Sequence, residues 1–324
     1  MKKSFKLFLA AAFLVTEFFV VALPLMITSA KADGHPIQAI THAGFGGGTD
    51  VTTRMMLLRT RRYLKQDMQL VNKKGGGGAA SMDYMMTLPA DGQHTLTWTT
   101  GHAVSMALGK TKVKLSDMQP LARGTDDPQL FVVNCKNDIK DAKKFISAQK
   151  SKSLKYGTTH VGGIDDVSAI AFTKKGKLTD PTIVAYKGVG PIKTNLIKGD
   201  IDVGVLNLGE AVTEIEDGTL CVSVVLASNR MEKLNNVPTA TELGIPVVLS
   251  TVRGFVTRKG VPADRKKQLE DAMIKAMEHK YFQSFLTDIG LDSTSVVGAD
   301  EWGKQMEVML AEMTAQLKAL GYIK

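Results

Sequence analysis

The sequence predicts an α/β protein of two domains, each built on a mainly parallel sheet flanked by helices. The chain has 324 residues, which suits two domains of about 150 residues each. Short apolar segments alternate with glycine-rich loops and helical patterns, as they do in α/β proteins. Apolar residues make up 44% of the chain and charged residues 23%. This is the composition of a globular protein and excludes wholesale disorder.

The first third of the chain carries the alternation most clearly. We expect strands over residues 37–42, 68–72 and 95–99. Helical patterns follow these strands over residues 51–63, 81–88 and 103–108. Glycine loops at residues 44–48 and 75–78 separate strand from helix, and Thr49 or Asp50 can cap the first helix.

The rest of the chain continues the pattern and adds two crossings between the domains. We expect further strands over residues 154–156, 182–185, 202–206 and 221–227, and helices over residues 138–148, 167–172, 191–198, 264–279 and 300–320. The apolar strands at 129–134 and 252–257 are the expected crossings, which suit a hinge. They divide the chain into a first lobe, residues 33–132 plus 253–324, and a second lobe, residues 133–252. Methionines along the final helix form an apolar stripe that we interpret as core packing.

The first 32 residues are typical of a secretory signal peptide. Three lysines precede an apolar run over residues 7–27, and Ala30 and Ala32 occupy the −3 and −1 positions of an A-x-A cleavage site. An uncleaved membrane anchor is the alternative, because the apolar run approaches the ~20 residues of a membrane span. Glu17 argues against an anchor, since a carboxylate at bilayer depth is costly. We therefore expect a periplasmic protein with a cleavable signal peptide.

The basic charge of the chain depends partly on this segment. The formal net charge is +9, which raises the question of nucleic acid. Removal of residues 1–32 takes away four lysines and one glutamate and leaves a charge of +6. For an exported protein we expect no nucleic acid partner, and we interpret the remaining charge as a mild bias toward anionic ligands.

The two cysteines, Cys135 and Cys221, would lie in an oxidising compartment after export. The sequence leaves open whether they form a disulfide or remain two buried free thiols. Their number excludes a disulfide-dense scaffold and a C-x-x-C zinc site.

Motifs for enzymes and cofactors are weak or absent. Gly75, Gly77 and Ala80 satisfy G-x-G-x-x-A, but a lone match does not establish a dinucleotide site. Residues 109–111 resemble the end of a P-loop, but the required earlier glycine is Val104. There is no G-x-S-x-G or H-E-x-x-H motif, and the six histidines show no metal-ligand spacing. We therefore predict no enzyme activity, no catalytic residue, no cofactor and no metal.

Three loops at expected strand-to-helix turns indicate anion binding. In the richest, residues 44–50, glycines let the backbone approach a ligand, and the following helix start supplies unpaired N–H groups and a positive dipole end. Residues 99–102 and 157–159 offer the same chemistry with added hydroxyl groups. A single loop of this kind is more often a tight turn. Three of them on a two-domain exported chain favour a ligand site, because ligands collect at the C-terminal ends of strands.

The chain also resembles a known family, the substrate-binding proteins of tripartite tricarboxylate transporters, also called Bug proteins. The similarity runs from about residue 37 to residue 321. Its markers occur in the expected order: Gly46, Gly47, Gly48, Thr49, Asp50 and Arg54; Asp91 and Gly92; Thr99, Thr100 and Gly101; Tyr156 and Gly157; Tyr186, Lys187, Gly188, Gly190 and Pro191; Gly199, Asp202 and Asn207; and Val237, Pro238, Thr239, Glu242, Gly244 and Pro246.

The resemblance implies a type II periplasmic-binding-protein fold, in which two lobes joined by hinge strands close on a ligand. It implies a small organic anion as ligand: a di- or tricarboxylate, an acidic amino acid or an aromatic acid. The expected function is a monomeric receptor that delivers this ligand to membrane permease subunits. A sensory binding protein for a membrane kinase is the alternative, and an exported hydrolase is a weaker one.

The sequence departs from the family pattern in places that bear on the ligand. His42, Gly44 and Phe45 stand where prolines are usual in the first loop. Gly163 and Asp166 stand where many members have serine and histidine. Leu206 replaces a residue that is often acidic. These differences leave the fold unchanged and alter the expected pocket.

The candidate ligand-binding residues come from both lobes. Some have structural interpretations that remain open: Asp50 as a helix cap, Arg253 as an internal ion pair rather than a carboxylate clamp, His102 as a polar helix start, and Tyr186 as support for its loop. The full set is Phe45, Gly46, Gly47, Gly48, Thr49, Asp50, Thr100, Gly101, His102, Thr158, Thr159, Asp166, Tyr186, Asn207 and Arg253.

Overall fold

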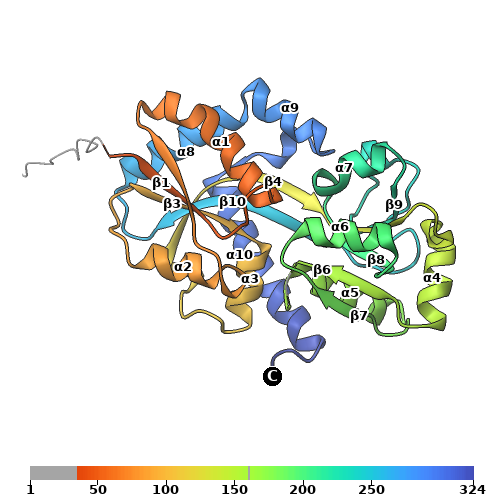
Figure 1. The fold of residues 1–324 in the computed structure, drawn as a ribbon. Helices are drawn as coiled ribbons and strands as arrows, with labels where there is room; N and C mark the ends of the chain where they lie inside the picture. The colour runs from red at the N-terminus through yellow and green to blue at the C-terminus, as the bar shows by residue number, and fades with distance from the viewer. Residues whose placement is uncertain (1–34, 160) are drawn as a thin grey trace, which may run out of the picture. The chain divides into compact units, whose positions relative to one another are not determined.

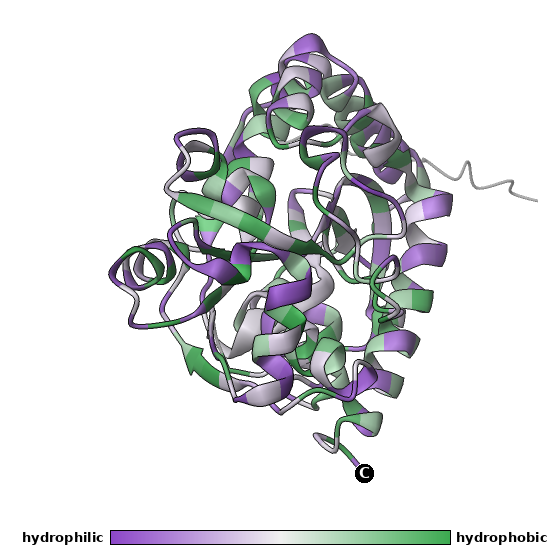
Figure 2. Cartoon of the chain, turned by 90° about the vertical axis from the view of Figure 1, so that its right-hand side faces the viewer, coloured by the Kyte–Doolittle hydropathy of each residue, from purple (hydrophilic) through white to green (hydrophobic). Residues whose placement is uncertain are grey.

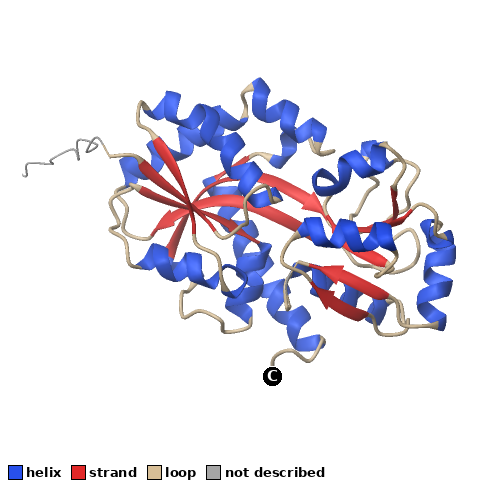
Figure 3. Cartoon of the chain, viewed as in Figure 1, coloured by secondary structure: helices blue, strands red, loops and turns tan. Residues whose placement is uncertain are grey.

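The structure is a computed structural model that describes residues 35–159 and 161–324, and it contains two sheets flanked by helices (Figure 1, Figure 3). The predicted signal peptide and its cleavage site lie outside the described residues. Within the described part of the chain, every helix is too short or too polar to span a bilayer.

The first sheet has the strand order β11-β4-β10-β3-β1-β2. Its strands are β1 (Ile37–Thr41), β2 (Met68–Asn72), β3 (His94–Thr99), β4 (Met118–Pro128), β10 (Ser250–Arg258) and β11 (Val297–Gly298). The helices that belong with it are α1 (Gly48–Leu64), α2 (Ala79–Met86), α3 (Thr100–Ala107), α8 (Ala263–Met277), α9 (Lys280–Asp288) and α10 (Ala299–Ala319).

The second sheet has the strand order β7-β6-β8-β5-β9. Its strands are β5 (Leu130–Asn134), β6 (Lys155–Thr158), β7 (Thr182–Ala185), β8 (Val203–Leu206) and β9 (Leu220–Val225). The helices that belong with it are α4 (Ala142–Ser151), α5 (Ile164–Lys175), α6 (Val189–Lys198) and α7 (Leu208–Glu216). Short 3₁₀ turns lie at Gly76–Gly78, Leu115–Asp117, Asp138–Lys140, Glu232–Leu234 and Ser293–Ser295.

The predicted α/β class is confirmed, and both sheets are mixed. Strand β1 pairs in parallel with β2 and β3, and β6 pairs in parallel with β7 and β8. The pairs that involve β4, β5, β9, β10 and β11 are antiparallel. The predicted parallel pairing therefore holds only among β1, β2 and β3 in the first sheet and among β6, β7 and β8 in the second.

Strand β4, helices α7 and α9 and the two-residue strand β11 were not expected from the sequence. Strand β4 carries Pro120 and Pro128, residues that usually exclude a central strand, and its charged residues hide the apolar alternation. Helix α7 contains Gly209 in its first turn, which weakens the helical pattern. Helix α9 begins at Lys280, directly after the predicted end of the preceding helix at residue 279, and His279 is its N-cap.

The two sheets are joined where strands β4 and β10 lie side by side (Figure 1). Gln129 is the one residue between β4 and β5, and its backbone bonds Leu249 O at 2.9 Å and Leu226 N at 2.8 Å. Its side chain donates to Thr251 Oγ1 at 2.7 Å. Ser250 pairs with Pro128 at the same level. The two crossing segments therefore hold each other by hydrogen bonds.

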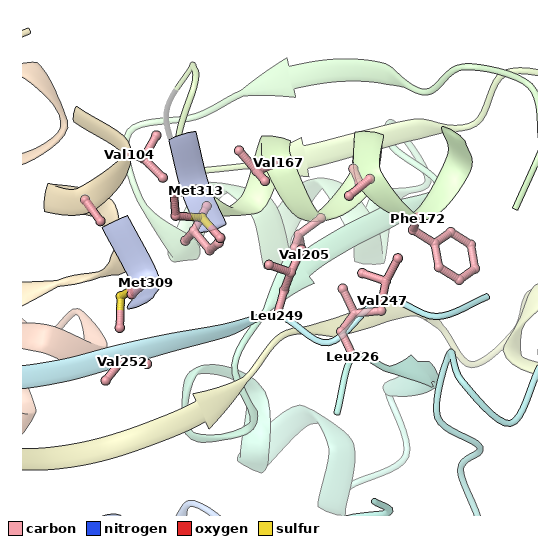
Figure 4. Packing of buried hydrophobic residues seen from close by; sticks show 14 of the residues in the cluster. Val104, Val167, Phe172, Val205, Leu226, Val247, Leu249, Val252, Met309 and Met313 are labelled. Carbon is pink, nitrogen blue, oxygen red and sulfur yellow. The ribbon is translucent and has the colours of Figure 1, made fainter. Parts of the chain in front are cut away.

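Helix α10 contributes to a buried cluster that also contains residues of both sheets. Met306, Met309, Met313 and Leu317 are all buried in it, which confirms the predicted core stripe. Figure 4 shows Met309 and Met313 close to side chains of α3, α5 and β10. In Figure 2 the helices carry both hydrophilic and hydrophobic residues, as helices with one buried face do.

Cys135 and Cys221 form a disulfide, with their Cα atoms 5.0 Å apart. Register explains the pairing: Val133 of β5 lies opposite Cys221 of β9, and Cys135 follows the end of β5. The bond links positions 86 residues apart in sequence. Of the two alternatives that the sequence left open, the structure therefore has the disulfide.

We predict that the double variant Cys135→Ser/Cys221→Ser unfolds at a lower denaturant concentration than the wild type. Loss of a cross-link over such a long loop should cost about 2–5 kcal/mol of unfolding free energy, because the unfolded chain regains its freedom. Urea unfolding with and without a reductant measures this. The reductant should weaken the wild type and leave the double variant unchanged; equal wild-type stability in both conditions would contradict the prediction.

Candidate functional site

A cavity of about 320 Å³ lies between elements of the two sheets. The first turns of three helices, α1, α6 and α7, contribute to its wall, together with α9 and the ends of the crossing strands. The lining residues are Gly46, Gly47, Gly48, Val51, Thr52, Asp127, Val189, Gly190, Lys193, Gly209, Glu210, Arg253, Phe285 and Ile289. A volume of this size suits a small organic molecule.

Two other hollows are larger but differ in character. One, of about 440 Å³, is lined by Leu58 and charged residues around the end of α1. The other, of about 650 Å³, lies between α8 and the segment that precedes α10. Each is lined by elements of the first sheet alone, whereas the 320 Å³ cavity joins both sheets and includes buried charged groups.

Helix α1 starts close to the side chain of Arg253, and this closeness explains a glycine of the first loop. A Cβ added to Gly48 would lie 2.6 Å from Arg253 Nη2 and 3.3 Å from a Glu210 carboxylate oxygen. Gly46 has φ 76, a conformation that glycine adopts without strain. The N-caps of α1 and α6, Gly47 and Gly188, have no capping side chain. The positive dipole end of α6 lies at the cavity, where Val189 and Gly190 are part of the lining.

Arg253 is buried at the centre of a polar network. Its Nη1 bonds Asp127 Oδ2 at 3.0 Å, its Nη2 donates to Asn207 Oδ1 at 3.1 Å, and its Nε donates to Thr49 Oγ1 at 3.3 Å. Asn207 also donates to the carbonyl oxygens of Asp127 and Pro128, at 2.9 and 3.0 Å. One guanidinium therefore ties the first turn of α1, the end of β4 and the start of α7 together.

Two carboxylates face this guanidinium. Burial raises the pKa of Asp127 to about 7, although Arg253 opposes the shift. Burial also raises the pKa of Glu210, again against the effect of Arg253. Glu210 accepts hydrogen bonds from the backbone N–H groups of Asn207, at 3.1 Å, and of Gly48. Its side chain thus caps α7 and reaches the start of α1.

The remaining residues of the first loop interact with each other. Asp50 pairs with Arg54 at 2.8 Å and accepts the Gly46 N–H at 3.1 Å. Burial alone would raise the pKa of Asp50, but these hydrogen bonds lower it below its usual value. Phe45 is exposed, with the Arg54 guanidinium 5.1 Å from its ring centre. Asp50 therefore orders the loop from within.

The threonine loop lies away from the cavity lining. Thr100 Oγ1 donates to Ser250 O at 3.0 Å and accepts from Val252 N at 2.9 Å, so it fixes the start of α3 to β10. Gly101 is buried beside it. His102 is fully buried; its Nδ1 accepts the Thr99 N–H at 3.0 Å.

The candidate residues of the second sheet are also outside the cavity lining. Thr159 bonds Asp165 through its N–H and its hydroxyl, at 2.9 and 2.6 Å. Asp166 accepts the Gly162 N–H at 2.6 Å. Thr158 is fully buried, and Tyr186 donates its backbone N–H to the Thr158 carbonyl at 2.8 Å. These contacts order the loop after β6.

The structure therefore brings together Gly46, Gly47, Gly48, Thr49, Asn207 and Arg253 from the predicted set. It adds residues that the sequence reasoning missed, chiefly Asp127, Glu210 and the start of α6. The Asn207-x-x-Glu210 spacing is a capping-box signal that could have located the start of α7. Asp127 gave no such signal, because it ends a strand that was not recognised. Among residues 35–159 and 161–324, no three His, Cys, Asp or Glu side chains are grouped to hold a metal ion.

Residues 52–320 match the family described as tripartite tricarboxylate transporter family receptor, TctC. The chain belongs to the TctC family. TctC proteins are solute-binding receptors of the periplasm rather than enzymes.

Individual relatives agree with this assignment. Protein BugT of Bordetella pertussis is 27% identical over 220 residues, which cover 65% of this chain and 66% of BugT. Among solved structures, the periplasmic binding protein BugD has a TM-score of 0.80 at 17% identity, with 89% of this chain and 98% of BugD covered. MatC of Rhodopseudomonas palustris, solved with bound malate, has a TM-score of 0.78 at 22% identity, with 87% and 98% covered. The type II periplasmic-binding-protein fold is thus confirmed.

We predict that Arg253 and Asp127 stabilise the protein as a pair. At pH 8 the Asp127 carboxyl is ionised, since its pKa is about 7. The variant Arg253→Met removes the group that lowers the pKa of Asp127, so that the buried carboxyl must stay unpaired or take up a proton. It should lose about 3–5 kcal/mol of unfolding free energy. Adding Asp127→Asn should recover part of the loss, with an interaction energy of about 1–3 kcal/mol in a double-mutant cycle.

Arg230→Met is the matched control for this cycle. Arg230 pairs with Glu242 at 2.9 Å, but both side chains are exposed, so the change should cost at most about 1 kcal/mol. Denaturant unfolding measures all four variants. Strictly additive losses at Arg253 and Asp127 would show that the two groups do not depend on each other.

We also predict that His102 makes stability depend on pH. Burial holds its pKa well below 6.5 in the folded protein. At pH values between the pKa of His102 in the folded protein and its pKa in the unfolded chain, the unfolded chain binds more protons than the folded protein. Acidification below pH 6.5 should therefore lower the unfolding free energy by up to about 1.4 kcal/mol per pH unit. In His102→Gln this contribution is absent, so the stability difference between wild type and variant should shrink from pH 7.5 to pH 5.5. A difference that stays constant over this range would refute the assignment.

Proposed function

We propose that this protein is a periplasmic receptor that binds a small organic carboxylate between its two lobes and delivers it to a tripartite tricarboxylate-type membrane transporter. The convergence of the α1, α6 and α7 starts with Arg253 around one cavity carries this proposal. Helix starts attract anions because their first N–H groups are unpaired and the helix dipole is positive there. MatC, a structural neighbour, was solved with malate, which supports a small carboxylate as the ligand.

The proposed mechanism is closure of two lobes, residues 33–132 plus 253–324 and residues 133–252. The lobes would move about the crossing segments, where Gln129 is the one residue between β4 and β5. Closure brings α6 and α7 against the start of α1 and surrounds the ligand. In this proposal residues 46–49 and the starts of α6 and α7 meet the ligand. Thr100, Thr158, Thr159, Asp166 and Tyr186 keep the surrounding loops in place.

Several features support the proposed location and partners. Residues 1–32 have the pattern of a cleavable signal peptide. The disulfide between Cys135 and Cys221 suits an oxidising compartment such as the periplasm. Membrane permease subunits are the partners that membership of the TctC family suggests. We propose that the receptor acts as a monomer.

Titration calorimetry tests the function. We expect saturable binding of one ligand per chain for at least one member of a panel of mono-, di- and tricarboxylates and amino acids, without turnover of that ligand. In Gly47→Val this binding should weaken at least tenfold, because the added branches project beside the cavity at a helix start. Gly47→Ala, which adds a single carbon at the same place, should lose less.

Thermal unfolding of both Gly47 variants controls for the fold. Binding that is unchanged in Gly47→Val would remove the start of α1 from the site. Absence of binding for every carboxylate, or catalytic conversion of one, would overturn the proposed function itself.

A further inference from the structure

The cavity contains a buried carboxylate oxygen that the protein itself does not use. Asp127 is 2% exposed and lines the cavity. Its Oδ2 pairs with Arg253, but its Oδ1 has no hydrogen-bond partner among the described residues. A buried acceptor left without a donor is costly. The cost is removed when a ligand supplies the donor.

A second carboxylate faces the same space. Glu210 lines the cavity and accepts only backbone N–H groups, those of Asn207 and Gly48, among its hydrogen bonds in the described chain. Charge repulsion from Glu210 raises the proton affinity of Asp127, which is part of the reason that the pKa of Asp127 is high. A cation placed between them would relieve this repulsion.

The positive groups of the cavity are already engaged. Lys193 pairs with Glu214 at 2.7 Å, and Arg253 pairs with Asp127 at 3.0 Å. With Lys193 balanced by Glu214, a single guanidinium remains opposite the two carboxylates of Asp127 and Glu210. When both carboxyls are ionised, the side chains around the cavity therefore leave an excess of one negative charge. The start of α6, whose N-cap Gly188 has no capping side chain, supplies positive potential to the same cavity.

We propose that this cavity selects a zwitterionic amino acid, whose protonated amine binds Asp127 Oδ1 and Glu210 while its carboxylate meets the start of α6 at Val189 and Gly190. A Cβ on Gly190 would contact no heavy atom within 4 Å, so the backbone there is open to a ligand. This inference rests on the proposed function and narrows its ligand class. A dicarboxylate is disfavoured, because its second carboxylate would meet two like charges.

Matched ligands distinguish recognition of an amine from recognition of a second carboxylate. The twenty common amino acids and 4-aminobutanoate are first screened by thermal shift against succinate and butanoate. Succinate has a carboxylate where 4-aminobutanoate has an amine, and butanoate has neither. The best amino acid is then titrated by calorimetry beside its analogue without the amine and its analogue with a second carboxylate. We expect the amine-bearing ligand to bind at least tenfold more tightly than either analogue.

Variants assign the preference to the two carboxylates. Glu210→Gln keeps the size of the side chain and one acceptor oxygen for the backbone N–H groups, but removes the charge. It should weaken amino acid binding at least tenfold and strengthen binding of the dicarboxylate analogue. Asp127→Asn should also weaken amino acid binding and strengthen binding of the dicarboxylate analogue. If loss of the Arg253 pair prevents Asp127→Asn from folding, Glu210→Gln alone decides the test. Glu216→Gln, which removes a charge from the exposed end of α7, is the control and should change neither affinity.

The outcomes are distinct. Wild-type preference for the amino acid, together with its reversal in Glu210→Gln, supports the inference. A dicarboxylate that binds wild type as tightly as the amino acid overturns the inference and leaves the proposed carboxylate receptor intact. Amino acid binding that is unaffected in both Glu210→Gln and Asp127→Asn overturns the assignment to these residues. Failure of every acid to bind rejects the proposed function and the inference together.

Discussion

The buried guanidinium of Arg253 is the interaction on which the arrangement of the site depends. A charge removed from water requires partners on several sides, and here those partners come from α1, β4 and α7. The glycine at position 48, the Asn207 cap and the carboxylate of Asp127 are all adapted to that one side chain. Segments that are more than a hundred residues apart in sequence, such as Asp127 and Arg253, are thereby held at one place between the sheets.

The rest of the fold supplies a rigid surrounding for this network. The β4 and β10 strands bond to each other as they pass between the sheets, and Thr100 attaches α3 to β10. The buried methionines of α10 pack in a cluster shared by both sheets. Apolar packing of this cluster thus holds in place the elements that make the polar contacts at the cavity.

Local sequence patterns predicted much of the fold and part of the site. Glycine loops followed by helical periodicity located α1 and residues 46–48, which line the cavity, and the spacing of Met306, Met309 and Met313 indicated burial correctly. Strand β4 was missed because its prolines and charges suit neither a strand nor a helix when read locally. Asp127, Glu210 and the disulfide depend on pairs of residues far apart in sequence. Only the folded register brings such pairs together, and one sequence does not contain that information.

The position of α10 has a consequence for biosynthesis. Its residues are made after every other described element, yet Met306, Trp302 and Leu317 belong to the buried cluster that includes side chains of β1 and β3 near the other end of the chain. A nascent polypeptide therefore cannot complete this core until translation has passed α10, and its apolar sheet face stays uncovered until then.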